Sequence, residues 1–153
     1  MNDARFFAFE SDFVDSLRCI PMAARLRLDL TGIKLKLNEW AKLDLAARHE
    51  AATLPCASHE ERVAYTVRVN ALVAASSGTL PGMLPELPVP EWENPGTVPA
   101  QVAAQAQSSG RRVSPADWSD LSPLQRFALI KLSRPGHENR NFIPACDEFG
   151  ISG

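Results

Sequence analysis

The sequence predicts an all-α fold over residues 1–153: a compact single-domain bundle of about six or seven short helices with a proline-rich extended segment. Apolar residues recur at the spacing of helices, next to residues that cap helix ends. Six of the twelve prolines fall within residues 79–99, where they exclude regular helix and central strand. The length suits one hydrophobic core, and 45% apolar and 22% charged residues match soluble globular proteins.

Charge and hydropathy exclude several classes of protein. The formal net charge of -2 lacks the positive field by which proteins bind nucleic acid. No window approaches the roughly 18 consecutive apolar residues of a membrane helix, and acidic residues interrupt the N-terminal stretch where a signal peptide would be apolar. We therefore expect a cytoplasmic protein, with neither nucleic acid nor a membrane as its partner.

The first predicted helix begins at Ser11 or Asp12, either of which can cap a helix N-terminus, and continues through Cys19. Pro21 then ends this helix or begins the next.

Residues 21–37 allow two interpretations. A helix up to residue 30 is favoured, because Gly32 suits the position just after a helix C-terminus. The alternation of Leu26, Leu28 and Leu30 is also typical of a strand, and the run that follows alternates as well. A hairpin therefore remains the alternative, although its turn would lack the Asn-Gly or Asp-Gly pair that two-residue loops prefer.

A short pattern occurs twice, 78 residues apart. Each copy predicts one turn of helix followed by a second helix capped by Asp or Ser. The tryptophans are interpreted as core anchors, and each arginine as a partner for an acid of the opposite copy. Duplication and the independent origin of two similar corners both stay open. The copies are Glu39-Trp40-Ala41-Lys42-Leu43-Asp44 with Arg48 and Leu54, and Asp117-Trp118-Ser119-Asp120-Leu121-Ser122 with Arg126 and Leu132.

Between the copies, Ser58 and Glu61 predict a capping box at the start of a helix that ends near Gly78. Val63, Val67, Ala71 and Ala74 form its apolar face.

The proline-rich segment 79–99 is predicted to lie extended on the surface, with Leu87 and Trp92 packing across the core. Thr97 then caps a short helix over 98–107, and residues 108–112 are the expected mobile loop.

The last third predicts three further helical segments. Ser114 begins the first, with proline at the next position. Ser122 caps an amphipathic core helix over 123–132, and Asn141 caps a final helix that ends near Gly150.

A polar loop between the last two helices is the candidate binding site for a partner protein. Binding residues often lie on loops held by rigid elements. The alternative is that these polar groups cap the flanking helices. The candidate residues are Arg134, His137, Glu138, Asn139 and Arg140.

The cysteines and histidines give a second candidate site. Cys56 and His59 have the spacing of a Cys-x2-His metal pair, and Cys19, His137 and Cys146 could complete a site only if the fold brings them together. A structural zinc ion needs four ligands, and a buried free cysteine is more often a small apolar residue. Cys146, like the others, is expected to be a reduced thiol.

The motifs of enzymes are missing from the sequence, which shows no glycine-rich phosphate loop, serine nucleophile elbow or paired carboxylates. We therefore expect a binding protein that is not an enzyme and has no cofactor of its own.

Three long motifs stand at the two ends of the chain and before the first tryptophan. They are Phe9-Glu10-x-Asp12-Phe13-Val14-Asp15-Ser16-Leu17-Arg18-Cys19-Ile20-Pro21-Met22, Gly32-Ile33-Lys34-Leu35-Lys36-Leu37-x-x-Trp40, and Leu124-Gln125-Arg126-Phe127-Ala128-Leu129-Ile130-Lys131-Leu132 with Gly136-His137-Glu138-Asn139. With these motifs the sequence resembles the nitrate reductase associated proteins, from about Phe6 to Gly150. The resemblance implies a small cytoplasmic protein of nitrate-assimilating bacteria, with a role in the maturation or activity of the molybdenum-containing assimilatory nitrate reductase.

Two functions follow from the resemblance and the residues. The first is a non-catalytic accessory factor that binds nitrate reductase or its apo form through the proline-rich segment and the loop 134–141. The second is a protein that delivers or senses a metal or cofactor through Cys19, Cys56 and His59, with His137 as a further candidate ligand.

Overall fold

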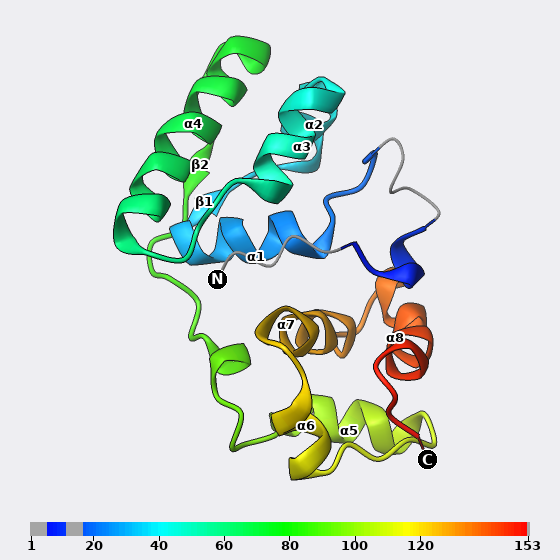
Figure 1. The fold of residues 1–153 in the computed structure, drawn as a ribbon. Helices are drawn as coiled ribbons and strands as arrows, with labels where there is room; N and C mark the ends of the chain where they lie inside the picture. The colour runs from blue at the N-terminus through cyan, green and yellow to red at the C-terminus, as the bar shows by residue number, and fades with distance from the viewer. Residues whose placement is uncertain (1–5, 12–16, 153) are drawn as a thin grey trace. The chain divides into compact units, whose positions relative to one another are not determined.

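The computed structural model describes residues 6–11 and 17–152, without the side chain of His137. It is 61% helical and, within these residues, holds eight α-helices and one two-stranded sheet (Figure 1). The prediction of an all-α fold is therefore confirmed. Within the same residues, no helix has both the length and the apolar composition needed to cross a membrane.

The chain divides into two compact units. Unit 1 comprises Met1–Phe6 and Glu10–Val89, and unit 2 comprises Phe7–Phe9 and Pro90–Gly153. The single cooperative domain expected from the sequence stays a prediction, which an unfolding experiment can test.

The described part of unit 1 contains four α-helices and the small sheet, in which β1 and β2 pair antiparallel with Ile33 opposite Met83. Its elements are α1 (Met22–Thr31), β1 (Ile33–Lys34), α2 (Leu37–Lys42), α3 (Leu45–Thr53), α4 (His59–Ser77) and β2 (Gly82–Met83).

The first helix of unit 1 settles the alternatives for residues 21–37. α1 ends at Gly32, which has φ +76° and donates its N–H to the carbonyl oxygen of Leu28 at 2.8 Å. This is the glycine C-cap that the sequence predicts. The hairpin alternative is wrong, because β1 pairs with β2 from the proline-rich segment and not with residues of α1.

The predicted capping box of α4 is confirmed. The Glu61 N–H donates to Ser58 Oγ at 3.1 Å, and the Ser58 N–H donates to Glu61 Oε1 at 2.9 Å. Gly78 ends the helix in the left-handed region, with φ +79°.

The apolar face predicted for α4 does not face the core. Val63 and Val67 are 50% and 65% exposed, whereas Tyr65, Val69 and Val73 are buried. The helix therefore carries two apolar stripes. The stripe that contains Tyr65 packs inward, and the Tyr65 hydroxyl donates a hydrogen bond to the carbonyl oxygen of Ala51 in α3.

Unit 2 is organised around α7, which packs against η2, α5, η3 and α8. Trp92 of η2 meets Phe127 of α7 edge to face, with ring centroids 5.2 Å apart.

The cap predicted at Thr97 is not found, because the N-cap residue of α5 is Pro99. Residues 108–112 remain only a predicted mobile loop. The elements are η2 (Glu91–Glu93), α5 (Ala100–Ser108), α6 (Pro115–Asp120), α7 (Pro123–Leu132), η3 (His137–Asn141) and α8 (Phe142–Glu148).

Near the N-terminus, η1 (Ala8–Glu10) precedes the first predicted helix. Most of that predicted helix falls on residues 12–16, which lie outside the described residues. At its far end, Leu17 has φ +52° and is buried.

The two units repeat one succession of elements at a constant offset. Gly32 and Gly110 both have positive φ, and both follow a helix whose N-cap is a proline. Four helical elements of each unit begin at the 78-residue spacing of the two tryptophan corners, which favours duplication over coincidence. The matched starts are Met22 and Ala100, Leu37 and Pro115, Leu45 and Pro123, and His59 and His137.

Candidate functional site

Each unit contains a corner with a fully buried tryptophan, formed by α2 and α3 in unit 1 and by α6 and α7 in unit 2. The indole N–H of Trp40 donates to the carbonyl oxygen of Leu17 at 2.7 Å. The indole N–H of Trp118 donates to the carbonyl oxygen of Asn94 at 2.9 Å. Both tryptophans are therefore core anchors, as predicted, with the polar end of the ring satisfied by backbone.

The arginines of the two corners bind backbone carbonyls. Arg48 donates from Nε to Trp40 O at 3.3 Å and from Nη2 to Ala41 O at 2.8 Å. Arg126 donates from Nη1 to Trp118 O at 3.2 Å and to Leu121 O at 2.6 Å. The ion pair predicted for Arg126 is replaced by these carbonyls, because a helix end leaves carbonyl oxygens that need donors. Burial also lowers the pKa of Arg126.

The predicted binding loop 134–141 divides into structural and exposed residues. Asn139 donates from Nδ2 to Leu132 O at 2.9 Å and accepts from Gln105 Nε2 at 3.3 Å. It therefore caps α7, which is the alternative interpretation for this residue. Arg134 and Arg140 are exposed. Glu138 is half-buried, and the side chain of His137 lies outside the described part of the chain.

The predicted metal ligands of unit 1 differ in exposure. Cys19 is exposed, Cys56 is buried, and His59 is exposed at the start of α4. Burial raises the pKa of Cys56, and the nearby guanidinium groups of Arg27 and Arg62 oppose this rise. Within the described residues, no three His, Cys, Asp or Glu side chains form a group that could hold a metal ion. The metal-site hypothesis gains no support from these positions.

In unit 2, Cys146 is buried in α8, and burial raises the pKa of its thiol to about 11. Cys146 is therefore a protonated, apolar core residue at neutral pH.

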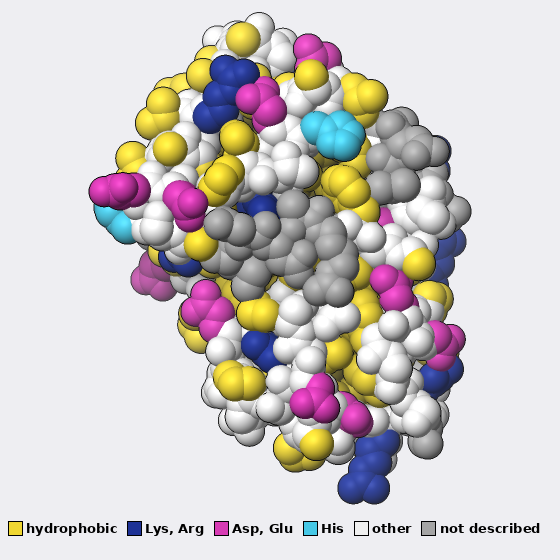
Figure 2. Space-filling view, in the orientation of Figure 1, with side chains coloured by type: hydrophobic (Ala, Val, Ile, Leu, Met, Phe, Trp, Pro, Cys, Tyr) yellow, Lys and Arg dark blue, Asp and Glu magenta, His cyan; other side chains and the backbone are white. Residues whose placement is uncertain are grey.

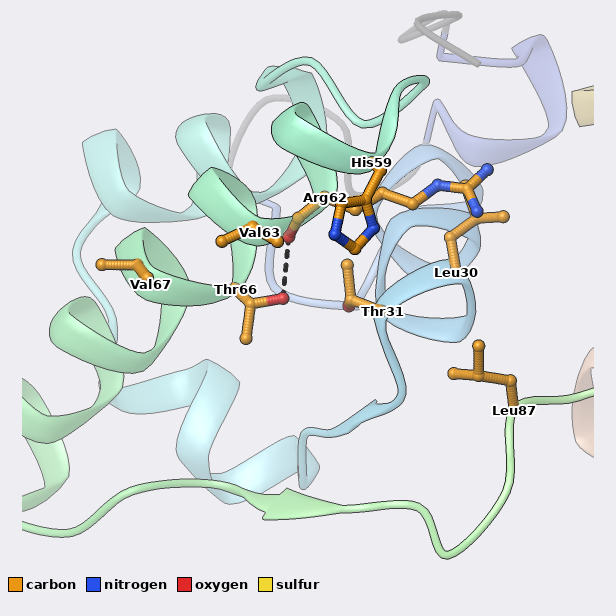
Figure 3. Close-up of a pocket in the computed structure, with 8 residues that line it drawn as sticks. All are labelled: Leu30, Thr31, His59, Arg62, Val63, Thr66, Val67 and Leu87. Atoms are coloured by element: carbon orange, nitrogen blue, oxygen red, sulfur yellow. Dashed lines mark hydrogen bonds between the residues drawn. The ribbon is translucent and has the colours of Figure 1, made fainter.

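A pocket of about 350 Å³ lies between α1, α4 and the proline-rich segment of unit 1 (Figure 3). Figure 3 shows the His59 ring directed towards Thr31, with Leu87 on the opposite side from Val67. The lining residues are Leu30, Thr31, His59, Arg62, Val63, Thr66, Val67 and Leu87.

The polar part of this pocket contains donors and basic groups. The hydroxyls of Thr31 and Thr66 donate to helix carbonyls, including Arg62 O. Arg62 uses Nε to bind Cys56 O at 3.2 Å. Its two Nη atoms and the His59 ring bind no other described residue. Among the described residues the lining includes no carboxylate, and the Arg62 guanidinium gives it a positive charge.

Gly32 determines how closely the proline-rich segment approaches α1. A Cβ atom at this position would lie 2.9 Å from Leu87 Cδ2 and 3.9 Å from Met83 Cε. Only glycine therefore combines the positive φ with this close approach. The predicted packing of Leu87 across the core is only partial, because its side chain meets Gly32 but stays 60% exposed.

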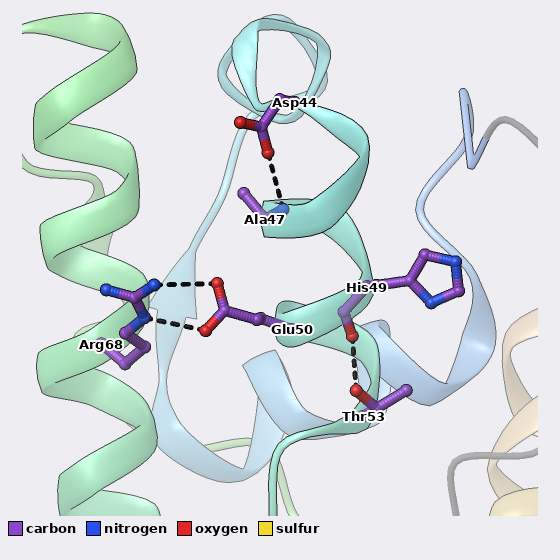
Figure 4. A network of polar contacts seen from close by, with 6 residues as sticks. All are labelled: Asp44, Ala47, His49, Glu50, Thr53 and Arg68. Carbon is purple, nitrogen blue, oxygen red and sulfur yellow. Dashed lines mark hydrogen bonds and ion pairs between the residues drawn. The ribbon is translucent and has the colours of Figure 1, made fainter.

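Polar contacts hold α4 against α3 and so fix one wall of the pocket (Figure 4). Arg68 donates to both carboxylate oxygens of Glu50, at 3.0 and 2.9 Å, and this carboxylate raises the pKa of Arg68. At the other end of α3, Asp44 accepts from the Ala47 N–H at 2.8 Å. These contacts are structural, since each satisfies a helix end or joins two helices.

Sequence reasoning missed the pocket, although a signal for part of it exists. The 78-residue offset pairs His59, Glu60 and Arg62 with His137, Glu138 and Arg140 of the predicted binding loop. Extending the repeat past Leu54 would have directed attention to the start of α4. Nothing local could have added Thr31 or Leu87, which come from separate segments.

The comparisons with known proteins give one result. The family described as conserved nitrate reductase-associated protein matches residues 6–149, which is nearly the whole chain. No curated protein and no solved structure matches it. The description links the chain to association with nitrate reductase. The chain belongs to the conserved nitrate reductase-associated protein family.

Proposed function

We propose that this protein is a non-catalytic accessory or maturation factor for the molybdenum-containing assimilatory nitrate reductase, and that it binds the reductase or its apo form. Family membership supports the choice of partner. The observation that carries the binding mode is that eight of the nine exposed, large apolar side chains among the described residues belong to unit 1. These are Leu37, Leu45, Val63, Val67, Leu80, Met83, Leu87 and Val89.

Four of these side chains form one surface. Val63, Val67 and Leu87 line the same pocket, and Met83 approaches Gly32 together with Leu87. We call Val63, Val67, Met83 and Leu87 the α4 apolar surface. Apolar side chains lie beside charged ones along the α4 part of the molecule (Figure 2).

Exposed apolar side chains on one surface favour a protein partner. Covering a valine or leucine side chain completely contributes about 1.5–3 kcal/mol, so a partner that covers this surface gains a substantial part of its binding free energy. Clustered apolar exposure of this kind marks interaction sites more often than scattered exposure does. Arg134 and Arg140 of the loop 134–141 are exposed and form a second candidate contact.

A deletion strain tests the accessory role. We expect cells that lack this protein to make the reductase polypeptide in normal amounts but with at least about tenfold less activity per polypeptide, restored by the full-length chain. Immunoblotting and a nitrate-reduction assay on the same extracts measure both quantities. Normal activity per polypeptide in the deletion strain would overturn the proposal.

A further inference from the structure

We propose that the pocket between α1 and α4 binds an acidic side chain that a partner protein presents on an apolar segment. The inference rests on the proposed function only in taking a protein as the ligand. It adds the chemistry of the segment that is bound and the residues that bind it. Its basis is the juxtaposition of an available guanidinium with exposed apolar walls in one pocket.

The charge of the pocket selects the acidic group. Of the described residues that line it, only Arg62 and His59 are ionisable. The carboxylate of Glu61, one position before Arg62, accepts from the N–H groups of Ala57 and Ser58 at 3.0 and 2.9 Å. Glu61 is thus engaged at the helix start, and Glu60 is exposed outside the lining. A ligand carboxylate would therefore meet positive charge without a competing acid in the pocket wall.

The guanidinium is also held in place for such a contact. Arg62 is half-buried, and the bond from its Nε to Cys56 O at 3.2 Å restricts its orientation. The Nη atoms, which bind no other described residue, remain as a pair of donors. A planar pair of donors matches the two oxygens of a carboxylate, which makes the contact directional as well as electrostatic.

The apolar walls indicate a protein segment as the source of the carboxylate. Val63 and Val67 stand four residues apart on α4, and Leu87 of the proline-rich segment lines the same pocket. Each is at least half exposed, so a small acid in the pocket would leave much of the wall in water. A protein segment with apolar side chains on both sides of an acidic residue can cover the apolar wall and bind the guanidinium at the same time.

Unit 2 provides a matched comparison. Arg140 occupies the position of Arg62 at the 78-residue offset, but the positions of Val63 and Val67 are taken by Asn141 and the buried Ala145. The basic residue is thus repeated without the exposed apolar wall. Arg140 belongs to the second candidate contact, so the charge control is Arg112→Glu, at an exposed arginine of unit 2 outside both contacts.

The test uses a display library of random short peptides selected on the immobilised full-length protein. We expect selected peptides to carry Asp or Glu next to apolar residues, and Arg62→Glu to weaken their binding by about tenfold or more. Val67→Ser should weaken it as well, whereas Arg112→Glu and Ile143→Ser, at exposed residues of unit 2 outside both candidate contacts, should not. Failure to select peptides, selected peptides without an acid, or equal binding by Arg62→Glu would overturn the proposal.

A second measurement keeps the test decisive if Arg62→Glu misfolds. Amide NMR spectra of the wild-type chain, titrated with a selected peptide and with its Glu→Gln version, should show shifts at Thr31 and Thr66 for the acidic peptide. Shifts confined to unit 2, or equal affinity for the two peptides, would contradict the inference.

The two proposals can fail separately. Selected peptides that depend on Arg62, combined with normal reductase activity in the deletion strain, would overturn the accessory role and leave the pocket inference standing. Reductase activity that depends on this protein, but is unaffected by Arg62→Glu and Val67→Ser, would overturn the pocket inference alone.

Discussion

Arg126 Nη1 donates a hydrogen bond of 3.2 Å to the carbonyl oxygen of Trp118, eight residues earlier in the chain. Arg48 repeats the relationship in unit 1, where Nε donates to Trp40 O across the same separation. The two corners therefore share more than a sequence pattern. In each, an arginine from the second helix binds the carbonyl of the tryptophan that the first helix buries.

The two arginines differ in burial, which predicts different contributions to stability. Arg126 is 5% exposed and also donates to Leu121 O and Trp92 O. Arg126→Met should lower the free energy of unfolding by about 3 kcal/mol, because three buried carbonyls lose their donor. Arg48→Met should lower it by about 1 kcal/mol, since water can replace a half-buried donor.

Urea unfolding followed by tryptophan fluorescence measures this difference. The exposed Arg140→Met variant is the control and should change stability by no more than about 0.5 kcal/mol. An Arg126→Met protein as stable as Arg48→Met would contradict this account of the corners.

Gly32 and Gly110 provide a matched pair for testing the approach of the proline-rich segment. Both have positive φ, so alanine at either position costs about 1 kcal/mol of backbone strain. At Gly32 the new Cβ would also strike Leu87, whereas a Cβ at Gly110 would have no atom of another described residue, its chain neighbours aside, within 4 Å. Gly32→Ala should therefore destabilise more than Gly110→Ala in thermal unfolding. Equal losses would show that Leu87 is not held against α1.

Local signals predicted most of the fold correctly. The capping box of Ser58 and Glu61 and the glycine caps at positions 32 and 78 are decided by neighbouring residues, and all three are found where expected. The pairing of Ile33 with Met83 was missed, because a two-residue strand has no pattern of its own and its partner is distant in sequence.

The inward face of α4 shows a different limit of sequence reasoning. Spacing identified Val63 and Val67 as one apolar stripe, but Tyr65, Val69 and Val73 form another on the same helix. Which stripe is buried depends on the neighbouring helices, and periodicity carries no information about them. Because the neighbouring helices cover the other stripe, Val63 and Val67 stay exposed and belong to the candidate binding surface.

Thiol reactivity should distinguish the three cysteines. Cys19 is exposed, whereas Cys56 and Cys146 are buried and have raised pKa values. Since the thiolate is the reactive species, Ellman's reagent near neutral pH should modify one thiol quickly and two only on unfolding. Cys19→Ser should remove the fast phase. Two fast thiols in the folded wild-type protein would contradict the assigned burial.

The raised pKa of Cys146 also predicts a loss of stability at high pH. The folded state keeps its proton up to about pH 11, whereas the unfolded thiol releases its proton near its ordinary value of 9.0. The native state thus binds more protons between about pH 9 and 11, and the free energy of unfolding falls as pH rises through this window. Cys146→Ala should reduce the slope of stability against pH there. An unchanged slope would exclude Cys146 as its source.

The candidate site was predictable only in part. His137 and Arg140 of the loop 134–141 correspond to His59 and Arg62, which line the pocket. The sequence contains this basic pair in both copies of the repeat, but it was predicted to bind a partner only in the loop 134–141. Asn139 shows why polar density alone misleads, since its amide caps α7 and joins Gln105.

Direct binding of purified full-length protein to purified apo nitrate reductase tests the central claim most directly. Titration calorimetry should show a saturable complex, weakened about tenfold or more when Val63→Ser and Val67→Ser are combined and unchanged by Ile143→Ser. Ile143 is the matched control because it is an exposed apolar residue of unit 2. No complex with either apo or mature reductase at about 100 μM would contradict the claim that this protein acts by binding the reductase.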